Sequence, residues 1–372
     1  MTTLPTIDES RFSDLFLNNI PLIDVRAPVE FGAGAFPSAV NLPLMNDDER
    51  HEVGKRYKAN GQDAAIALGE KLVSGEVKQA RIAAWEEFAN KSPEGALYCF
   101  RGGLRSRTSQ SWLSDAGINY PLVNGGYKAL RRYLIETLDK WVPTVPAIVV
   151  GGRTGTGKTR VLTACARALD LEGLANHRGS SFGANLSAQP TNIDFENALA
   201  IEYLKLANDS ANEAVVLEDE ARMIGRVGLP KILRQTLASA PIAILDVEFD
   251  ERVQNVLEDY VVDLCANYQA RDGDGEGRRA FYDHHRNAIL RVQKRLGGDN
   301  TKQVLTLLDI AFETMVEQSD VSGFEPYIAF LLNRYYDPMY DYQISSKQSR
   351  IHFQGNTEAV VEWISQNKDD LK

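Results

Sequence analysis

The sequence predicts an α/β protein with two domains, and three observations lead to this prediction. Short apolar stretches of strand length alternate with longer helical patterns. This alternation begins again after Trp141–Pro146, a stretch with two prolines that is typical of a linker. From about residue 250 onward the helical patterns dominate. We therefore expect an α/β domain over residues 8–140 and a second over residues 145–372, whose C-terminal part is mostly helical.

The expected strands share a run of apolar and β-branched residues that ends in a turn or in charged residues. In the first domain they are residues 20–28, 38–44 and 95–100. In the second domain they are residues 147–152, 214–222 and 241–249. Helices are expected over residues 106–117, which Gly117 ends, and over residues 158–169, where Val161, Leu162 and Leu169 fall on one stripe.

The composition indicates a soluble protein of the cytoplasm. Of the 372 residues, 44% are hydrophobic and 25% are charged, which is ordinary for a globular protein. No run approaches the roughly 18 consecutive apolar residues of a membrane span, and the start MTTLPTIDESRF lacks the features of a secretory leader. The three cysteines, Cys99, Cys165 and Cys265, are far apart and form no Cys-x-x-Cys pair, which argues against disulfides and structural zinc.

The segment GRTGTGKT fits the phosphate-loop pattern G-x-x-x-x-G-K-[ST] and lies between an expected strand and an expected helix. Glycines let successive backbone N–H groups curl around a phosphate, and the helix N-terminus favours negative charge. The lysine supplies a mobile cation, and the final hydroxyl suits Mg²⁺. The expected phosphate-binding residues are Gly152, Arg153, Thr154, Gly155, Thr156, Gly157, Lys158 and Thr159.

A second expected strand ends in acidic residues, and one of these could hold a Mg²⁺ ion together with the phosphate loop. Glu218, Asp219 and Glu220 follow the apolar run that begins at Ala214. One of them, Asp219 in our assignment, is expected to act with Thr159 in holding Mg²⁺. The alternative is that these carboxylates only end a strand and begin a helix, where the helix dipole favours them.

The stretch LYCFRGGLRS places a thiol among glycines and arginines, at the end of an expected strand and before a helix. Gly102 and Gly103 free the backbone to point N–H groups inward, and Arg101, Arg105 and the helix dipole favour a thiolate. Cys99 is therefore the expected nucleophile. The alternative is a buried structural cysteine, but such a residue would have apolar neighbours, as Cys165 and Cys265 do.

The spacing Cys-x5-Arg is shared by cysteine phosphatases and by sulfurtransferases of the rhodanese type, so the loop alone does not separate them. The flanking sequence does. LIDVRAPVEFGAGAFPSAVNLP, with Asp24, Arg26, Glu30 and Gly34, resembles the N-terminal rhodanese signature, and VNGGYKAL resembles the terminal one. The common rhodanese loop is one residue shorter, which puts simple thiosulfate chemistry in doubt.

A rhodanese-like domain followed by a P-loop NTPase-like domain, with CFRGGLRS and GGRTGTGKT, resembles the tRNA 2-selenouridine synthase family, and LANHRGSSFG resembles that family too. The resemblance spans almost the whole chain. It implies a transferase that converts 2-thiouridine at the wobble position (U34) of the tRNAs for Lys, Glu and Gln into 2-selenouridine. The open alternative is a sulfurtransferase or cysteine phosphatase fused to a nucleotide-binding P-loop module.

The resemblance also implies two co-substrates, geranyl diphosphate and selenophosphate. The P-loop would hold the diphosphate, and Cys99 would carry selenium. A selenophosphate synthetase is a possible partner. The geranyl chain requires an apolar groove, which Phe324–Tyr342 would line unless it is ordinary core.

The net charge of −10 argues against broad nonspecific binding of nucleic acid, but two local stretches are basic. Residues 127–134 follow the Gly-Gly turn and are expected near the cysteine loop. Residues 277–298 carry six Lys and Arg against one Asp. For each stretch the alternative is a solvated helix face. The candidate tRNA-binding residues are Lys128, Arg131, Arg132, Arg279, Arg286 and Lys294.

Overall fold

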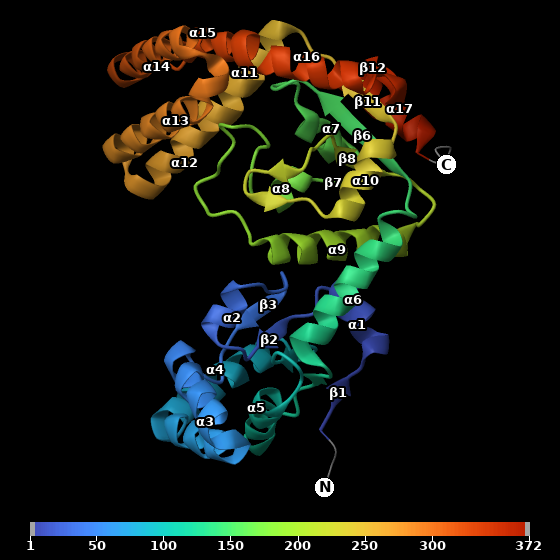
Figure 1. Cartoon of the computed structure of the whole chain (residues 1–372), viewed down its shortest axis with the longest axis vertical. Coiled ribbons are helices and arrows are strands. Elements are labelled where there is room, and N and C mark those ends of the chain that lie inside the picture. The colour runs from blue at the N-terminus through green and yellow to red at the C-terminus, as the bar shows by residue number, and fades with distance from the viewer. Residues whose placement is uncertain (1–3, 369–372) are drawn as a thin grey trace. The chain divides into compact units, whose positions relative to one another are not determined.

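The computed structural model describes residues 4–368 and confirms an α/β protein with parallel sheets (Figure 1). The chain divides into two compact units. The first unit comprises the chain up to Trp141 together with Thr191–Asn208, and the second comprises Val142–Pro190 and the chain from Asp209 onward. Residues 191–208 thus group with the first unit, although they lie within the range expected for the second domain.

The first unit contains a five-stranded sheet in the order β1-β5-β4-β2-β3, in which every pair is parallel. Because parallel strands need crossover connections, helices separate them in the sequence. The carboxyl ends of β2 and β4 lie side by side, so the residues that follow them meet at one edge. The strands are β1 (Thr6–Ile7), β2 (Leu22–Asp24), β3 (Ala39–Asn41), β4 (Ala96–Tyr98) and β5 (Leu122–Val123).

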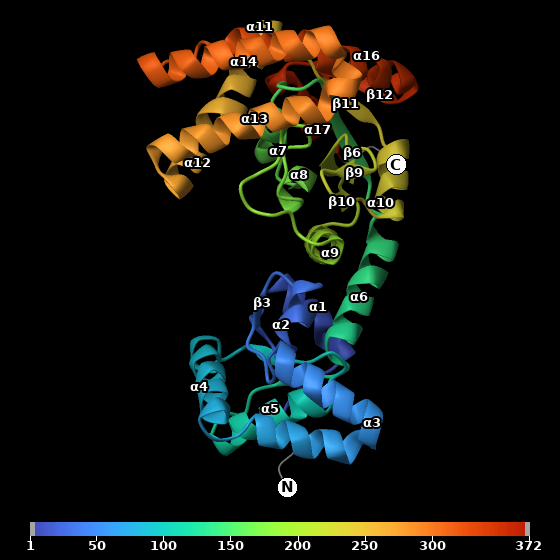
Figure 2. The ribbon, with the colours of Figure 1, turned by 60° about the vertical axis from the view of Figure 1, so that its left-hand side comes forward.

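One helix of the first unit departs from regular geometry. Residue Gly61 has a non-helical backbone with φ of 82°, so α3 consists of two arms that meet at this glycine (Figure 2). The helices of the unit are α1 (Phe12–Leu17), α2 (Pro28–Gly32), α3 (Asp47–Leu72), α4 (Gly75–Lys91), α5 (Leu104–Asp115), α6 (Gly126–Trp141) and α9 (Asn192–Asp209), with a 3₁₀ turn at Glu9–Arg11.

The second unit has its own five-stranded parallel sheet, in the order β12-β11-β6-β8-β7. Its central strand, β6, is buried along its whole length. A two-stranded antiparallel hairpin, β9 with β10, stands apart from this sheet. The strands are β6 (Ala147–Gly152), β7 (Ala168–Leu169), β8 (Val215–Glu218), β9 (Met223–Ile224), β10 (Val227–Gly228), β11 (Ile242–Leu245) and β12 (Ile351–Gly355).

Helices α7 and α17 pack on the second sheet, and a helical bundle with its own hydrophobic core follows β11 (Figure 1). Two segments in that bundle, Glu258–Val262 and Leu332–Tyr336, are π-helical. The helices are α7 (Lys158–Ala164), α8 (Leu171–Leu174), α10 (Lys231–Ser239), α11 (Phe249–Leu257), α12 (Asp263–Asp272), α13 (Asp274–Leu296), α14 (Gly298–Gln318), α15 (Phe324–Leu331), α16 (Asp337–Ser346) and α17 (Thr357–Asn367), with a 3₁₀ turn at Gln348–Arg350.

One element prediction needs correction. The helix expected over residues 158–169 ends at Ala164, because the chain becomes extended at Cys165 and Ala168–Leu169 forms β7 against β8. The mostly helical C-terminal part also contributes β12 to the edge of the sheet. Within residues 4–368, no helix is long and apolar enough to cross a membrane.

Candidate active site

Cys99 follows β4 directly, and its loop is held by a glycine turn from the other end of the first unit. The carbonyl oxygen of Cys99 accepts a hydrogen bond from the Tyr127 N–H at 2.8 Å. Gly126 makes this approach possible, because a Cβ at that position would lie 2.2 Å from the Cys99 oxygen. Gly102 also has a left-handed backbone, with φ of 63°, and a Cβ there would lie 2.8 Å from the nitrogen of Gly125. These positions therefore require glycine.

The thiol of Cys99 is buried and forms a hydrogen bond with the hydroxyl of Ser106, a residue that was not among the predicted site residues. Its Sγ lies 3.1 Å from the Oγ of Ser106, in the first turn of α5, and Ser106 Oγ also lies 3.1 Å from the carbonyl oxygen of Gly103. Ser106 follows Arg105 directly in the sequence, so its position next to the Cys-x5-Arg motif was the available signal. The hydroxyl is placed to donate a hydrogen bond to a thiolate.

The two arginines of the cysteine loop have different environments. Arg105 forms an ion pair with Glu30, with Nη1 2.6 Å from Oε2, and Arg50 contacts the same carboxylate at 2.9 Å. Burial acts to raise the pKa of Glu30, but its contacts with Arg105 and Arg50 outweigh burial and lower the pKa. Arg101 is exposed, and its guanidinium lies 5.8 Å from the ring centroid of Phe100. Arg105 is thus held in place, and Arg101 faces solvent.

A buried ion pair supports the loop from the neighbouring strand. Asp24, the last residue of β2, accepts hydrogen bonds from the Nε and Nη2 atoms of Arg26 at 2.8 and 2.6 Å. Nη2 also donates to the carbonyl oxygen of Gly34, and the guanidinium lies 3.8 Å from the ring centroid of Tyr127. The residues that carry the N-terminal rhodanese resemblance therefore fasten the segments around the cysteine loop.

The phosphate loop has the geometry that its sequence predicts. It connects β6 to α7, and Gly155 and Gly157 have left-handed backbones with φ of 83° and 79°. Thr156 donates from its hydroxyl to the carbonyl oxygen of Arg153 at 2.9 Å, which closes the turn. Lys158 begins α7, so the N–H groups at the N-terminus of this helix directly follow the curled backbone of the loop.

Helix α11 fixes the phosphate loop from outside. The Nε of Arg252 donates to the carbonyl oxygen of Thr154 at 2.9 Å, and the Nδ2 of Asn255 donates to that of Gly155 at 2.8 Å. Arg252 is itself buried and forms an ion pair with Asp337 at 2.5 Å. Sequence reasoning missed both residues, because they lie about a hundred positions from the motif and belong to no recognisable pattern.

Lys158 is partly buried and is surrounded by acidic groups. Its Nζ lies 3.5 Å from the carbonyl oxygen of Gly152. Burial acts to lower the pKa of Lys158, but the nearby Tyr340, Glu172 and Glu218 act in the opposite direction, and the net pKa is raised. The ammonium group is therefore charged at neutral pH and available to an anion.

Three carboxyl groups share the region beside Lys158. Burial, followed by the charge of Glu172, raises the pKa of Glu218 to about 8, and the same two causes raise the pKa of Glu220. Glu218 is fully buried, and its Oε2 accepts a hydrogen bond from the backbone N–H of Glu172 at 3.1 Å. Its Oε1 has no hydrogen-bond partner among the residues that the structure describes. Burial therefore favours the neutral form of Glu218.

The two residues expected to hold Mg²⁺ have different surroundings. The carboxylate of Asp219 is occupied by Lys347, whose Nζ lies 2.6 and 2.7 Å from its two oxygens. Thr159 is exposed on the first turn of α7. Across residues 4–368, no group of three or more His, Cys, Asp or Glu is placed to hold a metal ion.

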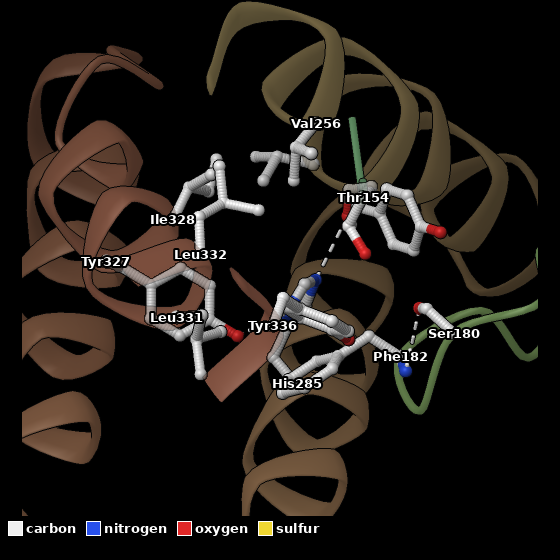
Figure 3. A pocket seen from close by; sticks show the side chains of 12 residues that line it. Thr154, Ser180, Phe182, Val256, His285, Tyr327, Ile328, Leu331, Leu332 and Tyr336 are labelled. Atoms are coloured by element: carbon white, nitrogen blue, oxygen red, sulfur yellow. Dashed lines mark hydrogen bonds between the residues drawn. The ribbon is translucent and has the colours of Figure 1, made fainter. Parts of the chain in front are cut away.

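An apolar cavity adjoins the phosphate loop at Thr154 (Figure 3). His285, which lines it, has its Nδ1 3.0 Å from the hydroxyl of Tyr327 and its Nε2 3.0 Å from the carbonyl oxygen of Tyr260. Burial, followed by the charge of His284, lowers the pKa of His285 to about 3, so the ring is neutral. The cavity measures about 30 Å³, roughly the space of one water. Part of the stretch 324–342, which was expected to line an apolar groove, lines this cavity. The lining residues from that stretch are Tyr327, Ile328, Leu331, Leu332 and Tyr336.

The first basic stretch contributes to a hollow beside the cysteine loop. Arg101, Lys128 and Arg132 line this basic hollow together with Asp8 and Glu9, and its volume is about 560 Å³. Arg132 also forms an ion pair with Glu9 at 2.9 Å. The structure therefore brings an arginine of the cysteine loop together with two of the candidate tRNA-binding residues.

The remaining candidates for tRNA binding are separate from this hollow. Arg131 is partly buried, and its guanidinium contacts Glu196 and Asn197 of α9, so it serves packing within the first unit. Arg279, Arg286 and Lys294 are exposed on α13, where Arg279 lies near Asp283.

These observations define the class of protein. A glycine-rich loop between a buried parallel strand and a helix makes the second unit a P-loop α/β domain. A family model described as "tRNA 2-selenouridine synthase AAA domain" matches residues 145–371. The chain belongs to the tRNA 2-selenouridine synthase family, and it is a transferase.

Relatives of nearly the same length carry that family name. A tRNA 2-selenouridine synthase of Marinobacter nauticus is 50% identical over 363 residues, which is 98% of each chain. One from Cupriavidus necator is 50% identical over 96% of this chain and 97% of its own. One from Pseudomonas savastanoi pv. phaseolicola is 47% identical over 97% of this chain and 99% of its own.

One solved structure also shows similarity. It is the crystal structure of the N-terminal domain of a putative ATP/GTP binding protein from Clostridium difficile 630, with 29% identity. The match covers 35% of this chain and 98% of that chain, with a TM-score of 0.30.

Proposed function

We propose that this enzyme converts 2-thiouridine at the wobble position of the tRNAs for Lys, Glu and Gln into 2-selenouridine. The conversion has two steps, alkylation of the sulfur by geranyl diphosphate and replacement of the geranylated sulfur by selenium from selenophosphate. One observation carries the proposal: a phosphate loop at Lys158 and a thiol loop at Cys99 occur in one chain of this family. Each loop suits the chemistry of one step.

In the first step, the sulfur of the nucleoside forms a bond to the geranyl carbon, and diphosphate leaves. The leaving group gathers negative charge, which Lys158 and the backbone N–H groups of residues 152–159 are placed to stabilise. Arg252 and Asn255 hold the loop in its curled form, so the donors need little rearrangement. Preorganised donors of this kind lower the barrier most.

The proposal for Mg²⁺ rests on Thr159, because Lys347 holds Asp219. The hydroxyl of Thr159 would contact a Mg²⁺ ion that arrives with the diphosphate, whose oxygens are the ligands Mg²⁺ prefers. The ion would supply additional positive charge to the leaving group.

In the second step, the selenium of selenophosphate forms a bond to C2 of the nucleoside, the C2–S bond breaks so that geranyl thiol leaves, and water cleaves the Se–P bond to release phosphate. We assign Cys99 to the site that receives the selenium donor, with Arg101, Gly102, Gly103 and Arg105 forming the cradle for selenophosphate. The contact of the thiol with Ser106 supports this role, because a hydroxyl can donate a hydrogen bond to a thiolate. A selenophosphate synthetase is the proposed source of the donor.

The tRNA is proposed to contact the basic hollow through Lys128 and Arg132, close to the cysteine loop. Arg279, Arg286 and Lys294 form the proposed second contact on α13. Both sets are solvent-exposed cations, which suit phosphate groups.

The experiment incubates the enzyme with an RNA stem-loop containing 2-thiouridine and analyses its nucleosides by mass spectrometry. Geranyl diphosphate alone should add one geranyl unit to the nucleoside, and the further addition of selenophosphate should yield 2-selenouridine. An unchanged nucleoside, together with phosphate release from a simple aryl phosphate, would instead support a cysteine phosphatase fused to a P-loop module.

A further inference from the structure

A groove in the first unit lies between the two arms of α3 and the helix that follows the cysteine loop. Its volume is about 790 Å³, within the range of about 300–1,000 Å³ that ligand pockets occupy. Residues of the first arm, such as Val53, face residues of the second arm, such as Ile66, and Trp112 of α5 closes one side. Figure 2 shows the two arms of α3, and the break in its backbone lies at Gly61.

The floor of this groove is apolar and is only partly covered by the protein. Val53 and Ile66 are only partly buried, while Tyr57 is 58% exposed. Ala65 is the single fully buried residue of α3 among its 26 residues, whereas a helix of this length normally buries a whole stripe against the core. The groove therefore has apolar surface left for a ligand.

The rim of the groove is positively charged. Four basic side chains, Arg50, Lys55, Lys58 and Arg105, and one acidic side chain, Glu70, line the groove. Arg50 and Arg105 also pair with Glu30, and Lys55 pairs with Glu52. Such a rim is unusual in a chain with a net charge of −10. An apolar floor with a cationic rim suits a ligand that joins a hydrocarbon group to a polyanion.

The groove opens beside the reactive thiol. Leu104 and Arg105, which follow the glycines of the cysteine loop, both line it, and Leu104 is 52% exposed. Cys99 belongs to the same hydrophobic cluster as the groove residues Met45 and Val73. A nucleoside presented to Cys99 would thus have its sulfur substituent near this surface.

We propose that the groove binds the geranyl group of the alkylated nucleoside while its sulfur is replaced at Cys99. This inference rests on the proposed function and adds where the hydrocarbon lies in the second step. The charged rim would meet the neighbouring phosphates of the RNA. The cavity beside the phosphate loop does not serve this purpose as it stands, because about 30 Å³ is too small for a ten-carbon chain.

The test compares two RNA stem-loops, one with S-geranyl-2-thiouridine and one with S-methyl-2-thiouridine. Selenation of each is measured with selenophosphate for the wild-type enzyme and for Ile66→Gln and Tyr57→Ala. We expect both variants to raise KM for the geranylated RNA by about tenfold and to leave KM for the methylated RNA unchanged. Val77→Gln, at an exposed valine of α4 outside the groove, is the matched control.

Equal effects on the two RNAs, or no effect on either, would overturn the groove assignment. Tyr57 is exposed, so its replacement tests the groove even if Ile66→Gln destabilises the fold. A wild-type enzyme that fails to convert the geranylated RNA would contradict the proposed function instead. Normal wild-type conversion with unaffected variants would contradict only the groove.

Discussion

The contact between Cys99 and Ser106 links the geometry of the cysteine loop to its chemistry. When the thiol is protonated, Ser106 donates to the carbonyl oxygen of Gly103 and its oxygen accepts from the thiol. When the thiol loses its proton, the hydroxyl can rotate and donate to the sulfur instead. A hydrogen bond to a charged acceptor is worth about 1.5–3 kcal/mol, so Ser106 favours the reactive form.

We therefore predict that Ser106→Ala lowers the rate of selenation by about tenfold or more, while geranylation is unchanged. Single-turnover assays with pre-geranylated RNA measure the first effect, and assays with 2-thiouridine RNA measure the second. Ser109→Ala is the control, because Ser109 lies in the same helix and donates to the carbonyl oxygen of Arg105. A normal selenation rate in Ser106→Ala would show that the hydroxyl does not assist the sulfur.

The environment of Glu218 disfavours the charged form of its side chain, whereas the contact with Ser106 favours the charged form of Cys99. Its pKa is raised from the ordinary value of 4.5 to about 8, first by burial and then by the neighbouring carboxylate of Glu172. Between these two pH values the folded protein keeps a proton that the unfolded chain loses. The free energy of unfolding must therefore fall as the pH rises through this interval.

Glu218→Gln should remove this pH dependence, because the amide has a similar shape and no charge. We expect the variant to match the wild-type Tm at pH 5 and to exceed it clearly at pH 8, measured by calorimetry. Glu313→Gln, at an exposed carboxylate of α14, should show no such difference. A variant with a lower Tm at both pH values would mean that Glu218 is charged and bonded in the folded protein.

At the residue scale, the sequence was sufficient where the chemistry is local. Residues 152–159 and 99–105 were identified because each loop is contiguous and its residue types have defined roles. Arg252 could not be found in this way, because its contact with Thr154 spans 98 positions. The pairing of Asp219 with Lys347, 128 positions apart, was hidden for the same reason.

At the scale of elements, the turn at Gly125–Gly126 is as important to the cysteine loop as the loop's own residues. Gly126 has φ of 57°, and a Cβ there would lie 2.2 Å from the carbonyl oxygen of Cys99. The turn also starts α6, whose first N–H groups bond to Cys99 and Phe100. The resemblance of VNGGYKAL to a rhodanese signature thus has a steric explanation.

Gly126→Ala is predicted to destabilise the first unit by about 1–3 kcal/mol and to abolish selenation, while geranylation persists. Denaturant unfolding and the two activity assays measure these effects. Gly32→Ala is the control, because a Cβ at Gly32 meets no atom within 4 Å and its backbone is not left-handed. Full selenation by Gly126→Ala would contradict the role of this close approach.

The predicted strands were confirmed where they are buried on both faces. The predictions failed where contacts between distant segments determine whether a strand or a helix forms. The expected strands at residues 147–152 and 241–249 became β6 and β11, because continuous apolar runs suit a parallel sheet. Strand β12 alternates between partly buried and exposed residues at the edge of the sheet, so its pattern was weak. The groove in α3 was not predicted either, because the break at Gly61 separates two segments that each look like an ordinary polar helix.

At the scale of the whole molecule, charge is unevenly distributed. The first unit, residues 1–141 and 191–208, carries 18 Lys and Arg against 21 Asp and Glu, whereas the rest of the chain carries 23 against 30. The first unit therefore repels a polyanion less than the second unit does. This distribution agrees with the placement of the basic hollow beside Cys99.

Lys128→Glu should weaken RNA binding and reduce the magnitude of the salt slope by about 1, as measured by fluorescence anisotropy over a range of KCl concentrations. Lys91→Glu, at an exposed lysine on α4, should have little effect and serves as the control. An unchanged slope in Lys128→Glu would place the RNA on another surface.

The central claim is that two loops in two compact units perform separate steps on one nucleoside. The most direct measurement is mass spectrometry of the nucleosides that Cys99→Ser and Lys158→Ala produce from 2-thiouridine RNA and from pre-geranylated RNA. We predict that Cys99→Ser accumulates S-geranyl-2-thiouridine without 2-selenouridine, whereas Lys158→Ala selenates only the pre-geranylated RNA. Loss of both steps in either folded variant would contradict the account.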